Sequence, residues 1–437
     1  RVNMKYLNLD KQILFNSLIF FFPISFLVGR SIVELFLFIF FITTLIYCKK
    51  WKNYLFDKNF IVILLSLYYL SVFFSTYINI EILAQITDQN LLLKSLINFR
   101  YVIYIISIWF VFQEIKLDKR FFLITIFVYL IFLIDGYFQF FTGENLLGYS
   151  MPSGRISGIF EDEYIFGSYI QKVIPIMITL FYLTFETKLK NKSLYLFLVL
   201  FLSTVIILLS GDRAAIIIFV FYLAISFLLV SSYRKILLMN FLISGAVLFL
   251  VVSFGIGKNL GTLDQRYNPE STYNAHSSQT RTNHPIFKYI PRDHFGHFLV
   301  VKEMAKDNLY FGKGLKSFRF MCRGKLGNFY PVDGGVCSTH PHNYYLQSIS
   351  AGGLIGLFFF SSIFILISFK MINIFLKLFK KTKNNELLTL STICIFVYLW
   401  PLIPTGNFFS NWISGFNCFA LGLFLFINSK SNSEKNK

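Results

Sequence analysis

The sequence has 437 residues, of which 55% are hydrophobic and only 14% are charged, and its mean hydropathy is +0.61. Since a soluble domain carries roughly 25% charged residues, this composition excludes a chain that folds in water and favours a protein embedded in lipid. The net charge of +19 would suit nucleic acid, but the basic residues cluster between apolar runs, as they do in membrane proteins. We therefore expect the lipid bilayer as a partner and no nucleic acid.

Twelve apolar runs of about 17–25 residues follow one another, each long enough to cross roughly 30 Å of hydrocarbon. Because lipid offers no water to unpaired backbone groups, such runs must be helices, so the sequence predicts an all-α integral membrane protein. No small-residue cleavage site follows the first run, which we expect to be a retained span. The runs cover residues 13–29, 31–47, 60–78, 96–112, 121–141, 165–185, 194–210, 214–230, 236–254, 344–369, 387–404 and 412–427.

The basic residues also predict how the spans are oriented. If the N-terminus is inside, the short cytoplasmic segments hold 23 Lys and Arg residues and the short outer loops hold four. Cytoplasmic loops are enriched in Lys and Arg, so this split predicts a multi-pass protein of a bacterial inner membrane with both termini cytoplasmic. Three regions follow: 1–254 with the first nine spans, 255–343 as one large, partly helical periplasmic loop, and 344–437 with three spans and a cytoplasmic tail.

The long loop, residues 255–343, differs from the rest of the chain because it is polar and contains all six histidines. It has twelve basic and six acidic residues, and long translocated loops are exempt from the positive-inside rule. Between Pro291 and Asn308, apolar residues fall on one side of a predicted amphipathic helix, which would lie on the membrane surface or cap the bundle. We expect the chemistry of the protein at this periplasmic face.

Two histidines stand directly before the tenth span, in the segment His340-Pro341-His342-Asn343. Helix N-termini attract anions and histidine titrates near neutrality, so the segment is a candidate phosphate-binding or catalytic site. The alternative is that these are interfacial polar residues that end a loop. Metal binding is a third alternative, but two histidines without nearby carboxylates or free thiols fit zinc poorly, so we expect neither a metal nor a cofactor.

Arginines near the edge of lipid are further candidates. Arg213 lies in the tight outer turn between the seventh and eighth spans, next to Asp212, which can cap the following helix. The two residues form either an interfacial anchor or, through the arginine, a bidentate clamp for phosphate. Arg100 lies within the fourth span and therefore needs a partner or a water-filled cavity. Arg155 lies in the 142–164 outer loop.

The long loop contains three more arginines of interest and two cysteines. Arg292 opens the predicted loop helix, and Arg319 and Arg323 follow it; taken alone, each is typical of a solvated surface charge. Cys322 and Cys337 would both face an oxidising compartment, which favours a disulfide between them. Such a bond closes a loop of about 15 residues, a constraint of roughly 3 kcal/mol on the unfolded chain.

Several motifs of energy-using enzymes are missing from the sequence. It contains no Walker A loop, which argues against ATP use, and no Gly-x-Ser-x-Gly or Asp-x-Asp segment. An enzyme whose site lies outside the cytoplasmic membrane has no access to nucleotide substrates. The energy of its reaction must therefore arrive with the substrate, for example as a lipid-linked pyrophosphate.

Four segments in chain order resemble the signature of the O-antigen ligase and polymerase superfamily. The fullest is the stretch 337–357, with the core His-Asn-Tyr-Tyr-Leu, and the resemblance covers most of positions 150–370. The N-terminal spans match only in hydropathy. The other three segments are Arg155-Ile-Ser-Gly-Ile-Phe160, Ser210-Gly-Asp-Arg-Ala-Ala215 and Asn308-Leu-Tyr-Phe-Gly-Lys-Gly-Leu315.

The resemblance implies a GT-C-like membrane glycosyltransferase, inverting and metal-independent, that takes a glycan from undecaprenyl pyrophosphate. In the ligases of the family the acceptor is a sugar of the lipid A-core. Arg213, Arg292 and His342 match the essential arginines and histidine of the family, whereas Asp212 stands where small or polar residues are usual. We expect the neighbouring polar side chains to contact the substrates: Arg100, Arg155, Arg319, His340 and Asn343.

Other functions fit the same pattern less well. A polysaccharide polymerase of the same superfamily is the nearest alternative, followed by a protein O-oligosaccharyltransferase. A transporter or flippase would explain the number of spans but usually shows repeated halves and charged or broken spans near mid-membrane. We expect the remaining histidines to be incidental: His276, His284, His294 and His297.

Overall fold

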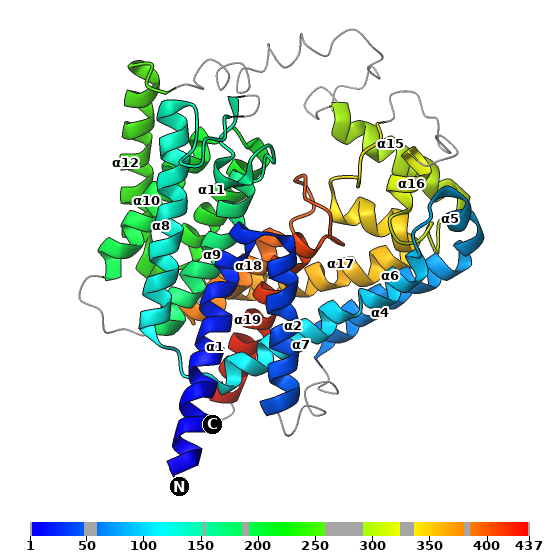
Figure 1. Ribbon diagram of the computed structural model, residues 1–437, viewed down its shortest axis with the longest axis horizontal. Coiled ribbons are helices and arrows are strands. Elements are labelled where there is room, and N and C mark those ends of the chain that lie inside the picture. Colours follow the sequence, from blue (N-terminus) through cyan, green and yellow to red (C-terminus); the bar gives the residue numbers. More distant parts are fainter. Residues whose placement is uncertain are drawn as a thin grey trace.

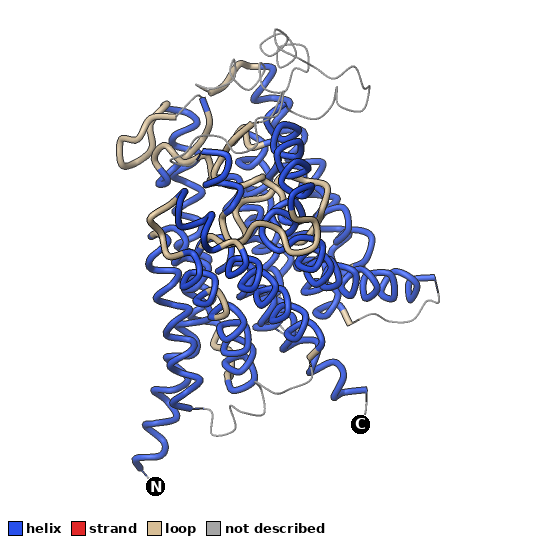
Figure 2. Tube along the Cα trace, turned by 90° about the vertical axis from the view of Figure 1, so that its right-hand side faces the viewer, coloured by secondary structure: helices blue, strands red, loops and turns tan. Residues whose placement is uncertain are grey.

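The computed structural model describes residues 2–47, 59–151, 154–185, 192–257, 292–323, 336–379 and 385–435. Apart from one isolated β-bridge between Glu144 and Ser150, the regular structure of these residues is helical. The all-α fold predicted from the apolar runs is therefore confirmed for the described part of the chain. Figures 1 and 2 show the helices gathered in a bundle, with both chain ends at the same end of it.

The helices follow the expected apolar runs in order, and Figure 1 labels most of them. Their bounds are α1 Val2–Val28, α2 Arg30–Tyr47, α4 Phe60–Ile78, α5 Ile80–Ile86, α6 Leu91–Ile97, α7 Arg100–Glu114, α8 Lys119–Thr142, η2 Gly158–Phe160, α9 Phe166–Phe185, α10 Lys192–Leu209, α11 Arg213–Leu229, η4 Ser231–Tyr233, α12 Arg234–Ser253, α15 Arg292–Asp307, α16 Ser317–Arg323, α17 Tyr344–Phe379, α18 Glu386–Tyr398 and α19 Asn411–Lys435.

Nine helical stretches of the described residues are long and apolar enough to cross a membrane, as a multi-pass membrane protein requires. The helices of the other three expected runs are apolar but shorter, so the count of twelve spans stays a prediction. The nine are Asp10–Val28, Arg30–Tyr47, Phe60–Ile78, Leu91–Glu114, Lys119–Thr142, Phe166–Phe185, Ser231–Ser253, Tyr344–Phe379 and Asn411–Asn432, and the shorter three are Leu194–Leu209, Arg213–Leu229 and Glu386–Tyr398.

Helix α1 begins at Val2 and α17 continues to Phe379, beyond the expected runs, whereas α18 ends early, at Tyr398 rather than at residue 404. Pro401 and Pro404 lack the amide hydrogen that a helix needs, and each also disfavours the helical conformation of the residue before it. The chain therefore leaves the helix early, and residues 399–410 form an irregular segment between α18 and α19.

The interior of the bundle is largely aromatic. Phe26 and Phe416 stack with their ring centroids 3.7 Å apart, and Phe22 and Phe419 stack at 4.9 Å, which ties α1 to α19. By contrast, α12 exposes apolar side chains, with Phe241 74% exposed. Such a surface is unfavourable in water but suits contact with lipid, so the distribution of apolar side chains agrees with a membrane protein.

The segments that the charge pattern assigns to one side also lie together in the structure. An ion pair of 2.8 Å joins Lys11 to Glu114, and Gln12 accepts a hydrogen bond from the backbone of Lys116, so the N-terminal segment contacts the segment after α7. The helices α15 and α16 of the long loop lie away from the chain ends in Figure 1. This arrangement agrees with the predicted sharing of sides; which side is cytoplasmic stays a prediction.

A break in α17 positions the segment after α15. Gly353 has φ +63°, a conformation that glycine adopts without the penalty of a Cβ. The opened turn exchanges backbone hydrogen bonds with the chain from Leu309 to Gly314: Leu309 and Tyr310 accept from residues 354 and 355, and Lys313 and Gly314 donate to Ser350 and Ala351. Two of the four segments that carry the family resemblance are thus joined into one unit.

Candidate functional site

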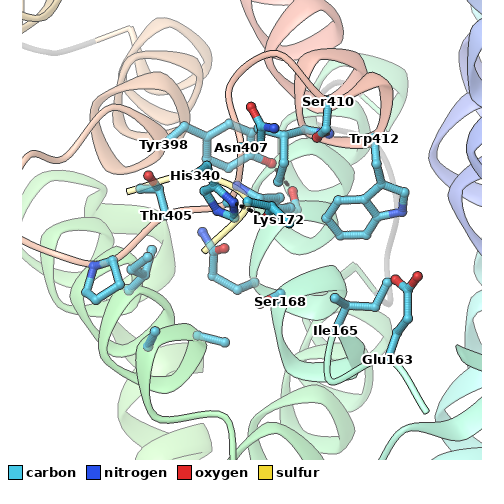
Figure 3. Close-up of a pocket in the computed structure, with 18 of the residues that line it drawn as sticks. Glu163, Ile165, Ser168, Lys172, His340, Tyr398, Thr405, Asn407, Ser410 and Trp412 are labelled. Carbon is cyan, nitrogen blue, oxygen red and sulfur yellow. Dashed lines mark hydrogen bonds between the residues drawn. The ribbon is translucent and has the colours of Figure 1, made fainter. Parts of the chain in front are cut away.

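A cavity of about 360 Å³ lies at the junction of the segments expected to be periplasmic (Figure 3). Its walls come from α9, the start of α11, the end of α18 and the start of α19. The 399–410 segment, α16 and residues 336–343 close it. Arg30 at the start of α2 and Glu163 in the turn before α9 also line it. We call this the junction cavity. Most of it lies outside the long loop, although that loop supplies one wall.

Four histidines gather at one edge of the junction cavity. His340 lines it, and the ring centroid of His342 lies 4.0 Å from that of His340. His297 and His294 of α15 lie 5.1 and 5.6 Å from His342. Sequence reasoning treated His294 and His297 as incidental, but the structure brings both against the candidate catalytic histidine. The other two, His276 and His284, lie outside the described residues.

The backbone of His342 is held in an unusual conformation. Its φ is +50°, in the left-handed region that L-residues rarely occupy. The carbonyl oxygen of His342 accepts a hydrogen bond of 2.8 Å from the amide of Thr405 in the 399–410 segment. Backbone strain of this kind persists where the surroundings hold it in place and is enriched at functional sites, so the geometry supports His342 as a site residue.

His340 is a neutral imidazole at ordinary pH. Burial, reinforced by the neighbouring His342 and its partners, lowers the pKa of His340 from its usual value to about 3. Its Nδ1 atom lies 2.9 Å from the hydroxyl of Thr339, whereas its buried Nε2 atom has no hydrogen-bond partner among the described residues. A buried polar atom without a partner costs about 1–3 kcal/mol, which suggests that a ligand completes it.

Arg213 opens α11 and is exposed beside the cavity wall formed by Ala214 and Ala215. Its neighbour Asp212 is the residue that departs from the family pattern. In the structure Asp212 is a helix cap for Ala215, accepts a hydrogen bond from Ser168, and forms its ion pair of 3.8 Å with Arg155. The carboxylate of Asp212 is therefore engaged with Arg155, Ser168 and the start of α11.

The remaining predicted residues separate into those at the junction cavity and those away from it. Arg319 of α16 lines the cavity. Arg292 is the first residue of α15, but its side chain lies outside the described residues, as does that of Arg323. Asn343 caps α17 by accepting from residues 345 and 346 and donates 2.7 Å to the carbonyl of Pro401. These bonds account for Asn343 as a structural link.

Arg100 lies at the start of α7, where its side chain has a full set of partners. It donates 2.6 Å to Glu34 and 2.8 Å to the hydroxyl of Tyr101, and it contacts Asn411 at 3.2 Å. The sequence required either a partner or a cavity for this charge. The structure provides the partner, Glu34, and Arg100 does not line the junction cavity.

The predicted disulfide is present and braces the cavity wall. Cys322 and Cys337 are bonded, with their Cα atoms 5.5 Å apart. The bond joins α16, which carries Arg319, to the segment that carries His340. Both of these residues line the junction cavity, so the disulfide holds two of its walls together.

Sequence reasoning missed the residues that form the floor of the cavity. Gln171 and Lys172 come from α9, Tyr398 ends α18, and Thr405 and Trp412 follow it. One signal was available: Lys172 is the single charged residue of the apolar run 165–185, and an ionisable residue inside a span is by default a functional candidate. The others carry no such signal, because only the fold brings them together.

The described residues contain no group of three or more His, Cys, Asp or Glu side chains placed to hold a metal ion. The four histidines meet ring against ring instead of converging on one point. No known protein family's sequence pattern matches the chain, and no curated protein matches it either.

Proposed function

We propose that the protein is an O-antigen ligase, a membrane glycosyltransferase that moves a glycan from undecaprenyl pyrophosphate to the lipid A-core at the periplasmic face. The observation that carries the proposal is the meeting of the resembling segments around one cavity. The segments that contain Arg213 and His340 both line it, and Arg155 is joined to the first of them through Asp212.

The reaction needs two kinds of help. A hydroxyl of the acceptor attacks the anomeric carbon of the glycan, the bond from that carbon to the pyrophosphate oxygen breaks, and the configuration inverts. Negative charge grows on the departing pyrophosphate, and preorganised cations at such a position are worth several kcal/mol. Arg213 and Arg292 are the proposed cations, because guanidinium groups bind phosphate oxygens in a bidentate fork.

His342 is the proposed general base. It takes the proton of the attacking hydroxyl, a role typically worth about 10²–10⁴-fold in rate. Its backbone is fixed by Thr405 and its ring is surrounded by His294, His297 and His340. The neutral state of His340 supports this role, since a second positive charge 4.0 Å away would hinder proton uptake by His342.

The test is transfer by the purified full-length protein in lipid nanodiscs. The donor is undecaprenyl-pyrophosphate-linked glycan and the acceptor is lipid A-core. We expect glycan-bearing lipid A-core to form, and its formation to be lost in Arg213→Ala and His342→Ala but kept in His284→Ala, a loop histidine that the proposal does not use.

Two outcomes would count against the proposal. Extension of the lipid-linked glycan without any transfer to lipid A-core would identify a polymerase instead. Wild-type rates in both Arg213→Ala and His342→Ala would remove the proposed mechanism altogether.

A further inference from the structure

Lys172 is a buried basic residue in the second turn of α9, with only 7% of its surface exposed. Pro175 follows it inside the same helix and cannot donate to the carbonyl of Gln171. The hydroxyl of Tyr398, at the end of α18, donates to the carbonyl of Lys172. Lys172 also lines the junction cavity, so its ammonium group is placed where a ligand can contact it.

The ammonium group of Lys172 has no acidic partner in the described part of the protein. It lies over the ring of Tyr398, 4.8 Å from the centroid, and no carboxylate among the described residues is within 4.0 Å. Glu163, which lines the cavity, forms an ion pair of 2.6 Å with Arg30, and Asp212 before α11 pairs with Arg155. Buried charges are normally paired, so the missing counter-charge is the notable feature of this site.

Four further polar atoms of the same cavity are buried without partners among the described residues. They are Nε2 of Gln171, Nε1 of Trp412, Oγ1 of Thr405 and Nε2 of His340. The Gln171 and Trp412 atoms can only donate, and the other two can donate as well. Figure 3 shows Lys172 and His340 between Thr405 on one side and Trp412 on the other. The cavity therefore offers at least two unpartnered donors, from Gln171 and Trp412, besides the ammonium group of Lys172.

We propose that Lys172 is the counter-charge for an anionic group of the ligand that fills the junction cavity, and that the unpartnered donors around it bind the oxygens of that group. The anion is a phosphate or a carboxylate: either the pyrophosphate of the lipid donor or the carboxylate of an acidic sugar in its glycan. Which of these it is rests on the proposed function; the anion site itself rests only on the cavity.

Binding to the full-length protein in nanodiscs tests the inference by calorimetry. The probes are farnesyl pyrophosphate, with uncharged farnesol as its match, and glucuronate, with glucose as its match. Lys172→Met removes the charge and keeps the length of the side chain. Lys172→Arg keeps the charge, and Lys302→Met removes a charge of the same sign from an exposed position on α15 outside the cavity.

We expect Lys172→Met to weaken the binding of one of the two anions by about tenfold or more, since a charge-assisted hydrogen bond is lost. Farnesol and glucose should be unaffected. Lys172→Arg should retain most of the affinity, and Lys302→Met all of it. Dependence of farnesyl pyrophosphate on Lys172 assigns the site to the phosphate, and dependence of glucuronate assigns it to an acidic sugar. Unchanged binding of both anions in Lys172→Met overturns the inference.

The same variants separate this inference from the proposed function. If the wild-type protein transfers no glycan but still binds an anion through Lys172, the anion site stands and the ligase proposal fails. If Lys172→Met transfers glycan at the wild-type rate while His342→Ala does not, the ligase proposal stands and the anion site at Lys172 fails. Should Lys172→Met fail to fold, Gln171→Met provides the second arm: losing a neutral donor should weaken the same anion several-fold, and unchanged affinity there contradicts the inference.

Discussion

Two basic residues within apolar runs of this protein, the partly buried Arg100 and the buried Lys172, stand in opposite surroundings. Arg100 at the start of α7 is enclosed by Glu34, Tyr101 and Asn411, each within 3.2 Å of its guanidinium nitrogens. Lys172 in α9 meets an aromatic ring and a set of unpartnered donors. The sequence presents both as a single charge within an apolar run, so it cannot distinguish them.

The presence or absence of a counter-charge separates structural charges from functional ones in a membrane protein. At Arg100 the cost of burial is offset within the chain, so a ligand has little to add there. At Lys172 no counter-charge within the described part of the chain offsets the cost of burial. This is characteristic of a site that is completed by its substrate. The network around Arg100 therefore favours a structural role over the substrate contact expected from the sequence.

The largest effect is expected at the histidines beside Lys172. His342→Ala should reduce glycan transfer by about 10²–10⁴-fold, the range of a lost general base, with little change in the melting temperature. Initial rates at saturating donor measure this, and His284→Ala is the control. If Arg100→Met lost as much transfer activity as His342→Ala, with stability unchanged, Arg100 would have a functional role rather than the structural one argued above.

The next largest effect concerns the disulfide that braces the cavity wall. Replacing both Cys322 and Cys337 by serine removes a constraint over a separation of 15 residues, worth about 3 kcal/mol in the chain-entropy model. We expect a lower melting temperature and faster hydrogen exchange in α16 and residues 336–343, with exchange around Arg100 unchanged. Cys394→Ser, which removes a free buried thiol, is the control. Equal loosening of both regions would contradict the local role of the bond.

Much of the fold can be predicted from the hydropathy and charge of the sequence. Every expected apolar run contains a helix, and the pairing of Cys322 with Cys337 follows from compartment and spacing. Both depend on local composition, which a single sequence contains. The early end of α18 was also readable, because Pro401 and Pro404 lie within the expected span. The mean hydropathy of the whole run does not reveal these two prolines.

The site was only half predictable, because its residues meet through tertiary packing. His340 and Arg319 were expected near a ligand and do line the cavity. His294 and His297 carry no sequence signal, because their approach to His342 depends on how α15 docks and which face it turns inward. Lys172 carries a signal, because it is the single charged residue of its apolar run, but the prediction placed the site mainly on the long loop.

At Arg100 the expected change is in stability. Arg100→Met leaves Glu34 in a partly buried position without its cation, with side-chain exposures of 23% and 25% in the native pair. Breaking such a pair should lower the free energy of unfolding by about 2 kcal/mol, less than for a fully buried pair. Thermal or chemical denaturation measures it, and Glu34→Gln combined with Arg100→Met should recover part of the loss. Lys172→Met should leave the stability of the protein unchanged, because it removes an unpaired charge. A melting temperature as low as that of Arg100→Met would contradict the proposed difference between the two residues.

The smallest effect is a pH dependence confined to the Lys172 region. The pKa of His340 is lowered from 6.5 to about 3 by burial and by His342, so the native state favours the neutral ring. Stability from this source is fully present above pH 6.5 and is lost as the pH falls toward 3, by about 1.4 kcal/mol per unit at most. Between pH 7 and pH 5.5 we expect the wild type to lose about 1 kcal/mol and His340→Gln to lose less. Arg100→Met should keep the wild-type slope, because it leaves the surroundings of His340 unchanged. A slope that disappears in Arg100→Met but persists in His340→Gln would contradict the assignment of the titration to His340.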